Sequence, residues 1–156
     1  MANDVDIVGV SKCFGEVEAL AGISARIKGG QLTGLIGPDG AGKTTLMRLL
    51  AALMTPTRGS ISVAGFDIAA EAKAVHSVTG YMPQRFGLYE DLSVAENLNL
   101  YADLSGLDPH SRSQTFGRLL HFTGLEPFQR RLSGQLSGGM KQKLGLACAL
   151  MARPRV

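Results

Sequence analysis

A glycine-rich segment at residues 37–45 has the residue types and the spacing that bind a polyphosphate. It fits the pattern G-x-x-x-x-G-K-S/T. Glycine permits the tight turns that aim several backbone N–H groups at one anion, and a following helix adds the positive end of its dipole. Lys43 would reach the terminal phosphates and the Thr44 hydroxyl would bind Mg²⁺. The segment therefore predicts nucleotide binding, with these candidate contacts: Gly37, Pro38, Asp39, Gly40, Ala41, Gly42, Lys43, Thr44 and Thr45.

A second candidate anion site is Leu136-Ser137-Gly138-Gly139-Met140, which precedes an expected helix. A serine and two glycines at a helix N-terminus offer a hydroxyl and free backbone N–H groups. The same residues are also compatible with a plain N-cap and a flexible lead-in. By themselves they leave both interpretations open.

The elements that must position these segments follow from hydrophobic spacing. Alternating or continuous apolar runs predict strands at residues 5–10, 23–27, 31–36, 60–63 and 78–82. Apolar residues at helical spacing predict a helix after the phosphate-binding segment, carrying Leu46, Leu49, Leu50 and Leu53, and a short helix near residues 68–75. A capping box starting at Ser93, the pair Asp108-Pro109 and a stripe from Met140 to Met151 predict three more helices. An α/β front half is thus followed by a helical segment from about residue 85 to 136.

Composition and charge limit the function classes. The chain has 156 residues, of which 45% are hydrophobic and 19% charged, an ordinary globular balance. The net charge of +3 comes without a run of five like charges, so it favours nucleic-acid binding only weakly. Cys13 and Cys148 have no metal-ligand spacing and are interpreted as free thiols. The start lacks a signal peptide and no apolar stretch is long enough to span a bilayer, which predicts a soluble cytoplasmic chain.

Taken together, the phosphate-binding segment and the LSGG segment about a hundred residues later resemble the nucleotide-binding domain of ABC transporters. The signature of that family is LSGGQ, and Met140 here replaces the glutamine, as in its drug-export and multidrug-resistance branch. Residues 37–45 correspond to the P-loop, or Walker A motif. The resemblance extends from about Val5 to the last residue. Within the family, the sequence resembles the ATP-binding subunits of bacterial ABC-2-type drug exporters.

Two further positions match the family. Gln84, after Gly80-Tyr81-Met82-Pro83, lies where the family has its Q-loop glutamine, which contacts Mg²⁺ or the attacking water. Phe14, in Ser11-Lys12-Cys13-Phe14-Gly15, lies where the family places an aromatic residue, often tyrosine, that stacks on adenine. An isolated phenylalanine more often belongs to a core, and only the resemblance favours stacking.

The resemblance implies a fold and a domain organisation. The expected fold class is α/β, a P-loop NTPase core with a RecA-like parallel sheet and an N-terminal antiparallel β-subdomain, into which an α-helical subdomain is inserted. Residues 1–156 would form a partial nucleotide-binding domain, incomplete at its C-terminus. About 1–84 and 137–156 would form the α/β core, and about 85–136 the helical subdomain.

The implied function is the ATP-binding subunit of a membrane exporter. Its cofactors would be ATP and Mg²⁺, with the metal bound by Thr44 and Gln84. Its partners would be transmembrane permease subunits, met through the Q-loop and the helical subdomain, and a second nucleotide-binding domain in a head-to-tail dimer. Nucleic acid is not an expected partner, and the chain would lie at the inner face of the cell membrane. The residues expected to act in catalysis are Lys43, Gln84, Ser137 and Gly139; those expected to contact ATP are Phe14, residues 37–45, Ser137, Gly138 and Gly139.

The family's Walker B aspartate, catalytic glutamate and switch histidine would follow the signature helix, beyond Val156. A chain of these 156 residues is therefore expected to bind ATP without efficient hydrolysis and to be marginally stable. Two alternatives stay open. One is a non-catalytic nucleotide-binding or interaction module, and the other, disfavoured by the absence of coiled-coil heptads, is a nucleic-acid-associated ABC ATPase.

Overall fold

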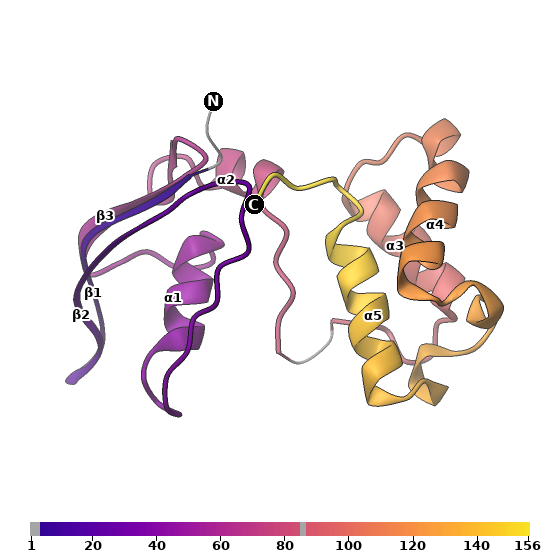
Figure 1. Cartoon of the computed structure of the whole chain (residues 1–156), viewed down its shortest axis with the longest axis horizontal. Coiled ribbons are helices and arrows are strands. Elements are labelled where there is room, and N and C mark those ends of the chain that lie inside the picture. Colours follow the sequence, from indigo (N-terminus) through magenta and orange to yellow (C-terminus); the bar gives the residue numbers. More distant parts are fainter. Residues whose placement is uncertain (1–3, 85–86) are drawn as a thin grey trace. The chain divides into compact units, whose positions relative to one another are not determined.

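The computed structural model describes residues 4–84 and 87–156, and the chain divides into two units. The first unit comprises the chain up to Thr79 together with Arg155–Val156, and the second comprises Gly80–Pro154. The first contains the sheet and two helices, and the second contains helices joined by short turns (Figure 1).

An antiparallel sheet forms the frame of the first unit. Its strands are β1 (Val5–Phe14), β2 (Val17–Ile27), β3 (Arg58–Val63) and β4 (Phe66–Asp67), in the order β2-β1-β3-β4. The first two make a hairpin in which Val5 pairs with Ile27 and Phe14 with Val17. The predicted strands 5–10 and 23–27 are too short on the side of the hairpin turn, where β1 continues to Phe14 and β2 begins at Val17. Polar residues near the turn interrupt the apolar alternation there.

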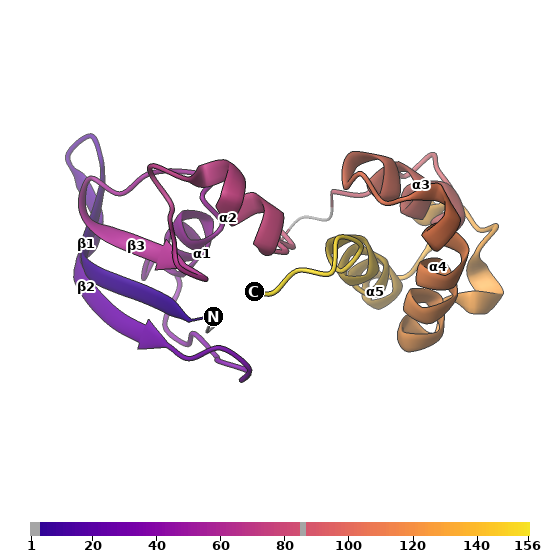
Figure 2. The same ribbon diagram turned by 90° about the horizontal axis from the view of Figure 1, so that it is seen from above.

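Two helices cover one face of this sheet (Figure 2). They are α1 (Lys43–Leu50) and α2 (Ala72–Val78). Leu49 of α1 and Val75 of α2 are both fully buried, in one core with Ile68, which follows β4, and with the inward residues of the strands: Val5, Ile7, Val10, Leu20, Ile61 and Val63. This apolar burial is what fixes α1, and with it the loop that precedes α1, against the sheet.

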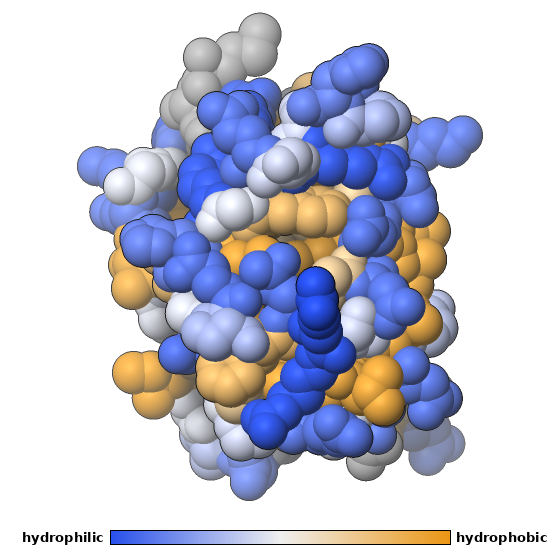
Figure 3. Space-filling model, turned by 90° about the vertical axis from the view of Figure 1, so that its right-hand side faces the viewer, coloured by the Kyte–Doolittle hydropathy of each residue, from blue (hydrophilic) through white to orange (hydrophobic). Residues whose placement is uncertain are grey.

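The second unit is built on three helices. These are α3 (Val94–Leu104), α4 (Pro109–Thr123) and α5 (Gly138–Ala149), with single 3₁₀ turns at Glu126–Phe128 and Ser133–Gln135. One hydrophobic core joins all three and includes Leu98, Leu119 and Leu144, of which Leu98 and Leu144 are fully buried. Figure 3 looks onto this unit and shows apolar surface interrupted by hydrophilic side chains. No helix within residues 4–84 and 87–156 is long and apolar enough to cross a membrane.

The local helix signals are confirmed. Ser93 and Glu96 form the reciprocal capping box of α3, and Asp108 caps α4 with Pro109 in its first turn. The Ser137 hydroxyl accepts a hydrogen bond from the N–H of Met140 at the start of α5. Each signal depends on residues only two or three positions apart, so it needs no distant partner.

Two predicted strands are wrong. Residues 31–36 and 79–82 are irregular, and Val78 is the last residue of α2. Leu32 and Ile36, expected in a buried strand, are 103% and 95% exposed. A strand of a parallel sheet requires neighbours on both sides, and the described residues contain no strand that pairs with either segment. Helix α1 also ends at Leu50, so Leu53 lies outside it and is exposed.

The expected grouping of 137–156 with the α/β core stays a prediction. In the structure α5 shares its core with α3 and α4, whereas the RecA-like parallel sheet that would join the two groups does not form among the described residues. The expected start of the helical insertion at about residue 85 lies outside the described residues.

Candidate functional site

The phosphate-binding loop connects an irregular segment to the N-terminus of α1. Its backbone turns at Gly40 and Gly42, whose φ values are +79° and +81°, a conformation that glycine adopts without strain. The N–H of Ala41 donates to the carbonyl oxygen of Pro38 across the turn, at 3.3 Å. No side chain caps α1. Its first N–H groups are therefore available to an anion, and the helix dipole favours one there.

Gly42 holds the end of this loop against the sheet. A Cβ atom at this position would lie 2.4 Å from the carbonyl oxygen of Ala19 and 2.6 Å from a methyl carbon of Leu20, both on β2. Only a residue without a side chain permits this approach. Together with the positive φ, the contact explains why the motif requires glycine immediately before the lysine.

The Lys43 ammonium folds back over the loop that precedes it. Nζ donates to the carbonyl oxygens of Gly37 and Pro38, at 2.8 and 2.6 Å. These two bonds place a positive charge beside the N-terminus of α1. The next residue, Thr44, is exposed, and its hydroxyl makes no hydrogen bond to any described residue. The loop thus combines backbone donors, one cation and one free hydroxyl.

Phe14 lies at the end of β1, with its side chain half-exposed. The Lys12 ammonium lies 5.3 Å from the centroid of the Phe14 ring and donates a hydrogen bond of 2.8 Å to the carbonyl oxygen of Thr55. The aromatic side chain is therefore a surface feature of the first unit rather than part of its core. Sequence reasoning missed Lys12, although the two-residue spacing on one strand could have indicated it.

The LSGG segment occupies the N-terminus of α5. Ser137 is the N-cap residue, and Gly138 and Gly139 form the first turn. A Cβ atom built on either glycine would meet nothing within 4 Å. Packing inside the chain therefore does not require glycine at these two positions, and the exposed turn can receive a group that approaches closely from outside.

Gln84 is exposed and lies in a bend after Pro83. The segment that begins at Gly87 is held by hydrogen bonds and an ion pair to other residues of the second unit. Tyr101 Oη donates to the carbonyl oxygen of Gly87 at 2.6 Å, and Ser133 Oγ donates to that of Tyr89 at 2.7 Å. Lys141 of α5 forms a 2.7 Å ion pair with Glu90.

Asn97 completes this network from inside. It is fully buried, accepts from the N–H of Tyr89 at 3.0 Å and donates to the carbonyl oxygen of the same residue at 3.1 Å. Asn97 thereby ties Tyr89 to α3, and the bond from Ser133 ties the same residue to the turn that precedes the signature. No sequence signal marked Asn97, because a polar residue on a helix is normally exposed.

The shifted pKa values in this unit include those of Cys148 and Glu96. Burial raises the pKa of the Cys148 thiol to about 12, so this cysteine is an unreactive core group. Hydrogen bonds from the Ser93 hydroxyl and then from the Ser93 N–H lower the pKa of Glu96. Neither group lies in the phosphate-binding loop. Core burial causes the shift of Cys148 and the helix cap causes that of Glu96, so neither shift marks a binding site.

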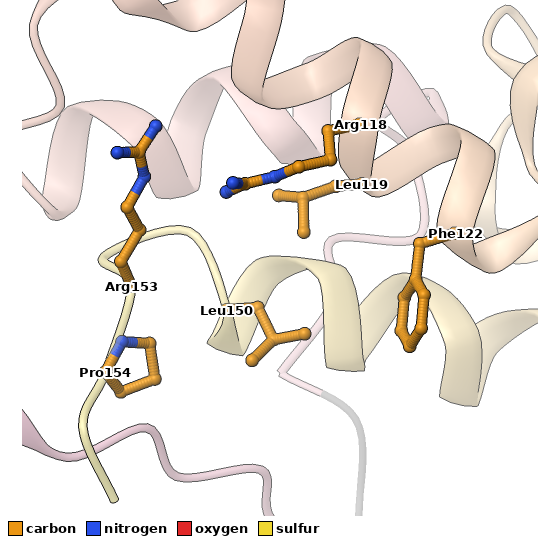
Figure 4. A pocket seen from close by; sticks show the side chains of 6 residues that line it. All are labelled: Arg118, Leu119, Phe122, Leu150, Arg153 and Pro154. Atoms are coloured by element: carbon orange, nitrogen blue, oxygen red, sulfur yellow. The ribbon is translucent and has the colours of Figure 1, made fainter.

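A hollow of about 410 Å³ lies in the second unit, between α4 and the residues that end and follow α5 (Figure 4). Four apolar side chains and two arginines line it: Arg118, Leu119, Phe122, Leu150, Arg153 and Pro154. It lacks the glycine turns and the open helix N-terminus of the phosphate-binding loop. We therefore place no nucleotide contact there.

The predicted site residues thus fall into two sets. Phe14 and residues 37–45 belong to the first unit, and Gln84, Ser137, Gly138 and Gly139 belong to the second. Within residues 4–84 and 87–156, no group of three or more His, Cys, Asp and Glu side chains could bind a metal ion.

Known proteins match nearly the whole chain. The family model described as ABC transporter matches residues 20–156. The chain is 58% identical to the probable multidrug ABC transporter ATP-binding protein YbhF of Escherichia coli, over 99% of this chain and 27% of that protein. It is 37% identical to the daunorubicin resistance ATP-binding protein DrrA3 of Streptomyces coeruleorubidus, over 97% of this chain and 48% of that protein.

A solved structure confirms the expected fold class. It is described as the dimeric structure of a post-hydrolysis state of the ATP-binding cassette MJ0796 bound to ADP and Pi. The likeness covers 96% of this chain and 70% of that one, with a TM-score of 0.84 and 27% identity. By contrast, the chain spans about half or less of the length of the two curated relatives.

Proposed function

Because the chain belongs to the ABC transporter family, we propose that it binds ATP through the phosphate-binding loop of its first unit. The observation that carries this proposal is the loop itself. It places two glycines with positive φ, an uncapped helix N-terminus and the Lys43 ammonium at one point. These groups fit a polyphosphate because they supply several donors and a positive charge, with no carboxylate bonded among them.

Groups of the loop and of the end of β1 would contact different parts of the nucleotide. Backbone N–H groups of 40–45 would bind the β- and γ-phosphates, and Lys43 would bind them as a cation. Phe14 would stack on the adenine ring. Asp39 is proposed as a nucleotide contact only because it lies within the loop, since its side chain makes no hydrogen bond to a described residue that would support a role.

Mg²⁺ fits the loop with few protein ligands. This ion keeps several water molecules and is commonly bound by one or two protein oxygens together with substrate phosphates. The exposed Thr44 hydroxyl can supply one such oxygen, and we propose Gln84 as the second. When bound, the ion neutralises phosphate charge; the chain's own part is to hold Thr44 next to the loop.

The signature turn would act on the nucleotide of a second copy. Ser137 caps α5, and the open space at Gly138 and Gly139 leaves room for a phosphate group of another chain. We propose a head-to-tail dimer in which Ser137 and Gly139 contact the γ-phosphate bound by the partner's loop. The solved structure described as dimeric supports a dimer by likeness, and the head-to-tail orientation is part of the proposal.

We further propose that the full protein hydrolyses ATP to drive an exporter, as the names of the E. coli and Streptomyces relatives suggest. The segment after Gln84 would meet transmembrane permease subunits at the inner face of the membrane. Its residues from Gly87 on are bonded to Asn97 of α3, to Ser133 in the turn before the signature and to Lys141 of the signature helix. A polypeptide of only these 156 residues would bind ATP with little turnover, because no described carboxylate or histidine is bonded within the loop to orient water.

Equilibrium binding of ATP tests the central proposal. The unaltered chain should bind Mg-ATP, and Lys43→Ala should weaken binding at least tenfold, since it removes the side-chain cation that bonds within the loop. Lys73→Ala is the matched control, because Lys73 is exposed on α2. Equal affinity of Lys43→Ala and the unaltered chain would refute nucleotide binding at this loop.

A further inference from the structure

Lys12 and Phe14 form one surface group at the end of β1. They are two residues apart on β1, where the pairing with β2 shifts register between Lys12 and Cys13, and their side chains lie together on the surface. The Lys12 ammonium lies 5.3 Å from the centroid of the Phe14 ring, within the range of about 6 Å in which a cation is attracted to an aromatic face. The ring is half-exposed, so part of its surface is free to contact another molecule.

The ammonium is held in place from a second direction. Its Nζ donates to the carbonyl oxygen of Thr55 at 2.8 Å. The chain at Thr57 is itself bonded to β1, because its hydroxyl accepts from the N–H of Cys13 at 3.0 Å and its own N–H donates to the carbonyl oxygen of Ser11 at 2.8 Å. The cation is thus fixed beside the ring by a segment that is anchored to the same strand.

This group lies on the strand pair that supports the phosphate-binding loop. Lys12 pairs with Leu20 of β2, and Leu20 with Ala19 forms the surface against which Gly42 packs. The ring, the cation and the end of the loop are therefore positioned by the same hairpin. A nucleotide bound by its phosphates at the loop would have its base near this end of the sheet.

We propose that Lys12 is a positioning residue for the nucleotide base, and this rests on the proposed stacking role of Phe14. The ammonium occupies one face of the ring, which leaves the opposite face for the base. It also draws π-electron density toward itself, so the opposite face becomes a better partner for an electron-rich ring. The group therefore selects a purine over a pyrimidine by stacking, without hydrogen bonds to the base edge.

The experiment compares ligands with and without a base. Binding of ATP, CTP and inorganic tripolyphosphate is measured for the unaltered full chain and for Phe14→Ala, Lys12→Met and Lys12→Arg. Methionine keeps the length of the side chain without its charge, and arginine restores a cation. Lys73→Met on α2 is the control for the loss of one positive charge, because ATP and tripolyphosphate are both anions.

We expect Lys12→Met to lower the affinity for ATP about two- to fivefold relative to tripolyphosphate, the range that an exposed cation–aromatic contact supports. The preference for ATP over CTP should fall with it. Lys12→Arg should restore both ratios, and Lys73→Met should leave them unchanged. If Lys12 only stabilised the fold around the loop, Lys12→Met would reduce the binding of ATP and of tripolyphosphate equally. That result would overturn the proposal.

The remaining outcomes separate this inference from the proposed function. If Phe14→Ala lowers the ATP-to-tripolyphosphate ratio but Lys12→Met does not, the inference is wrong and the stacking role stands. If Phe14→Ala changes nothing, the stacking role fails and the inference fails with it. If the unaltered chain binds neither ligand, nucleotide binding at the loop is itself refuted.

Discussion

Gly42 and Lys43 are adjacent residues with opposite requirements at the phosphate-binding loop. Gly42 must lack a side chain because β2 lies against it, with the Ala19 carbonyl oxygen 2.4 Å from where a Cβ atom would be. Lys43 needs its whole side chain, because its ammonium reaches back to Gly37 and Pro38. One residue positions the loop on the sheet, and the other supplies its charge.

Replacing Gly42 should therefore affect both stability and ligand binding. We expect Gly42→Ala to lower the free energy of unfolding by about 2–3 kcal/mol, because alanine at φ +81° is strained and its Cβ would force the loop away from β2. Urea unfolding measures the change. Gly37→Ala is the matched control, since its Cβ would meet Ala41 at an ordinary 3.6 Å; equal loss in both variants would contradict the steric argument.

At the scale of elements, α3 shows how a helix start can carry a pH dependence. The Ser93 hydroxyl and N–H both donate to Glu96 Oε2, at 2.6 and 2.7 Å, and lower the pKa of that carboxyl from its ordinary 4.5. A carboxyl with a lowered pKa in the folded state stabilises the fold above pH 4.5. That contribution is lost as the pH falls below 4.5 through the lower value in the folded protein.

Glu96→Gln should remove this acid sensitivity. The variant should be less stable than the unaltered chain at pH 7, and the difference should shrink at pH values below 4.5. Urea midpoints at pH 7 and at pH 3.5 measure it, with Glu16→Gln, at an exposed turn residue, as the control. A difference that stays constant with pH would show that the capping box acts through shape alone. Ser93→Ala should cost about 1 kcal/mol at pH 7.

At the scale of the whole molecule, the candidate nucleotide contacts are divided between two units with separate cores. The first unit holds the phosphate-binding loop against a sheet, and the second presents the signature turn on a three-helix core. In the proposed function, one copy would bind phosphates through its first unit alone. In the proposed dimer, the second unit would contact the nucleotide of the other copy.

Hydrogen exchange can distinguish these two steps. ATP should slow exchange at residues 40–45 at every protein concentration, because those N–H groups would bind phosphate within one chain. Protection at 138–141 should increase with protein concentration, because it would require a second copy. Lys43→Ala should abolish both effects. Protection at 138–141 that is independent of concentration would contradict the head-to-tail arrangement.

Local signals could be predicted from the sequence because they involve residues that are close along the chain. The phosphate-binding pattern, the Ser93–Glu96 capping box and the proline start of α4 each depend on a few neighbouring residues. The resemblance to the ABC transporter nucleotide-binding domain depends on short sequence motifs of this kind, and the family match confirms it. The roles of Phe14, Gln84 and Ser137 remain predictions.

Only the tertiary structure decided which distant residues meet. The apolar run at 31–36 has the composition of a buried strand, but a strand forms only where a neighbour supplies its hydrogen bonds, and Leu32 and Ile36 are instead exposed. The burial of Asn97 also depends on how distant segments pack. So does the hydrogen bond from Lys12 to Thr55, which is 43 positions away in sequence. Short-range patterns specify where a turn or a helix begins, whereas contacts between distant segments depend on how the whole chain packs.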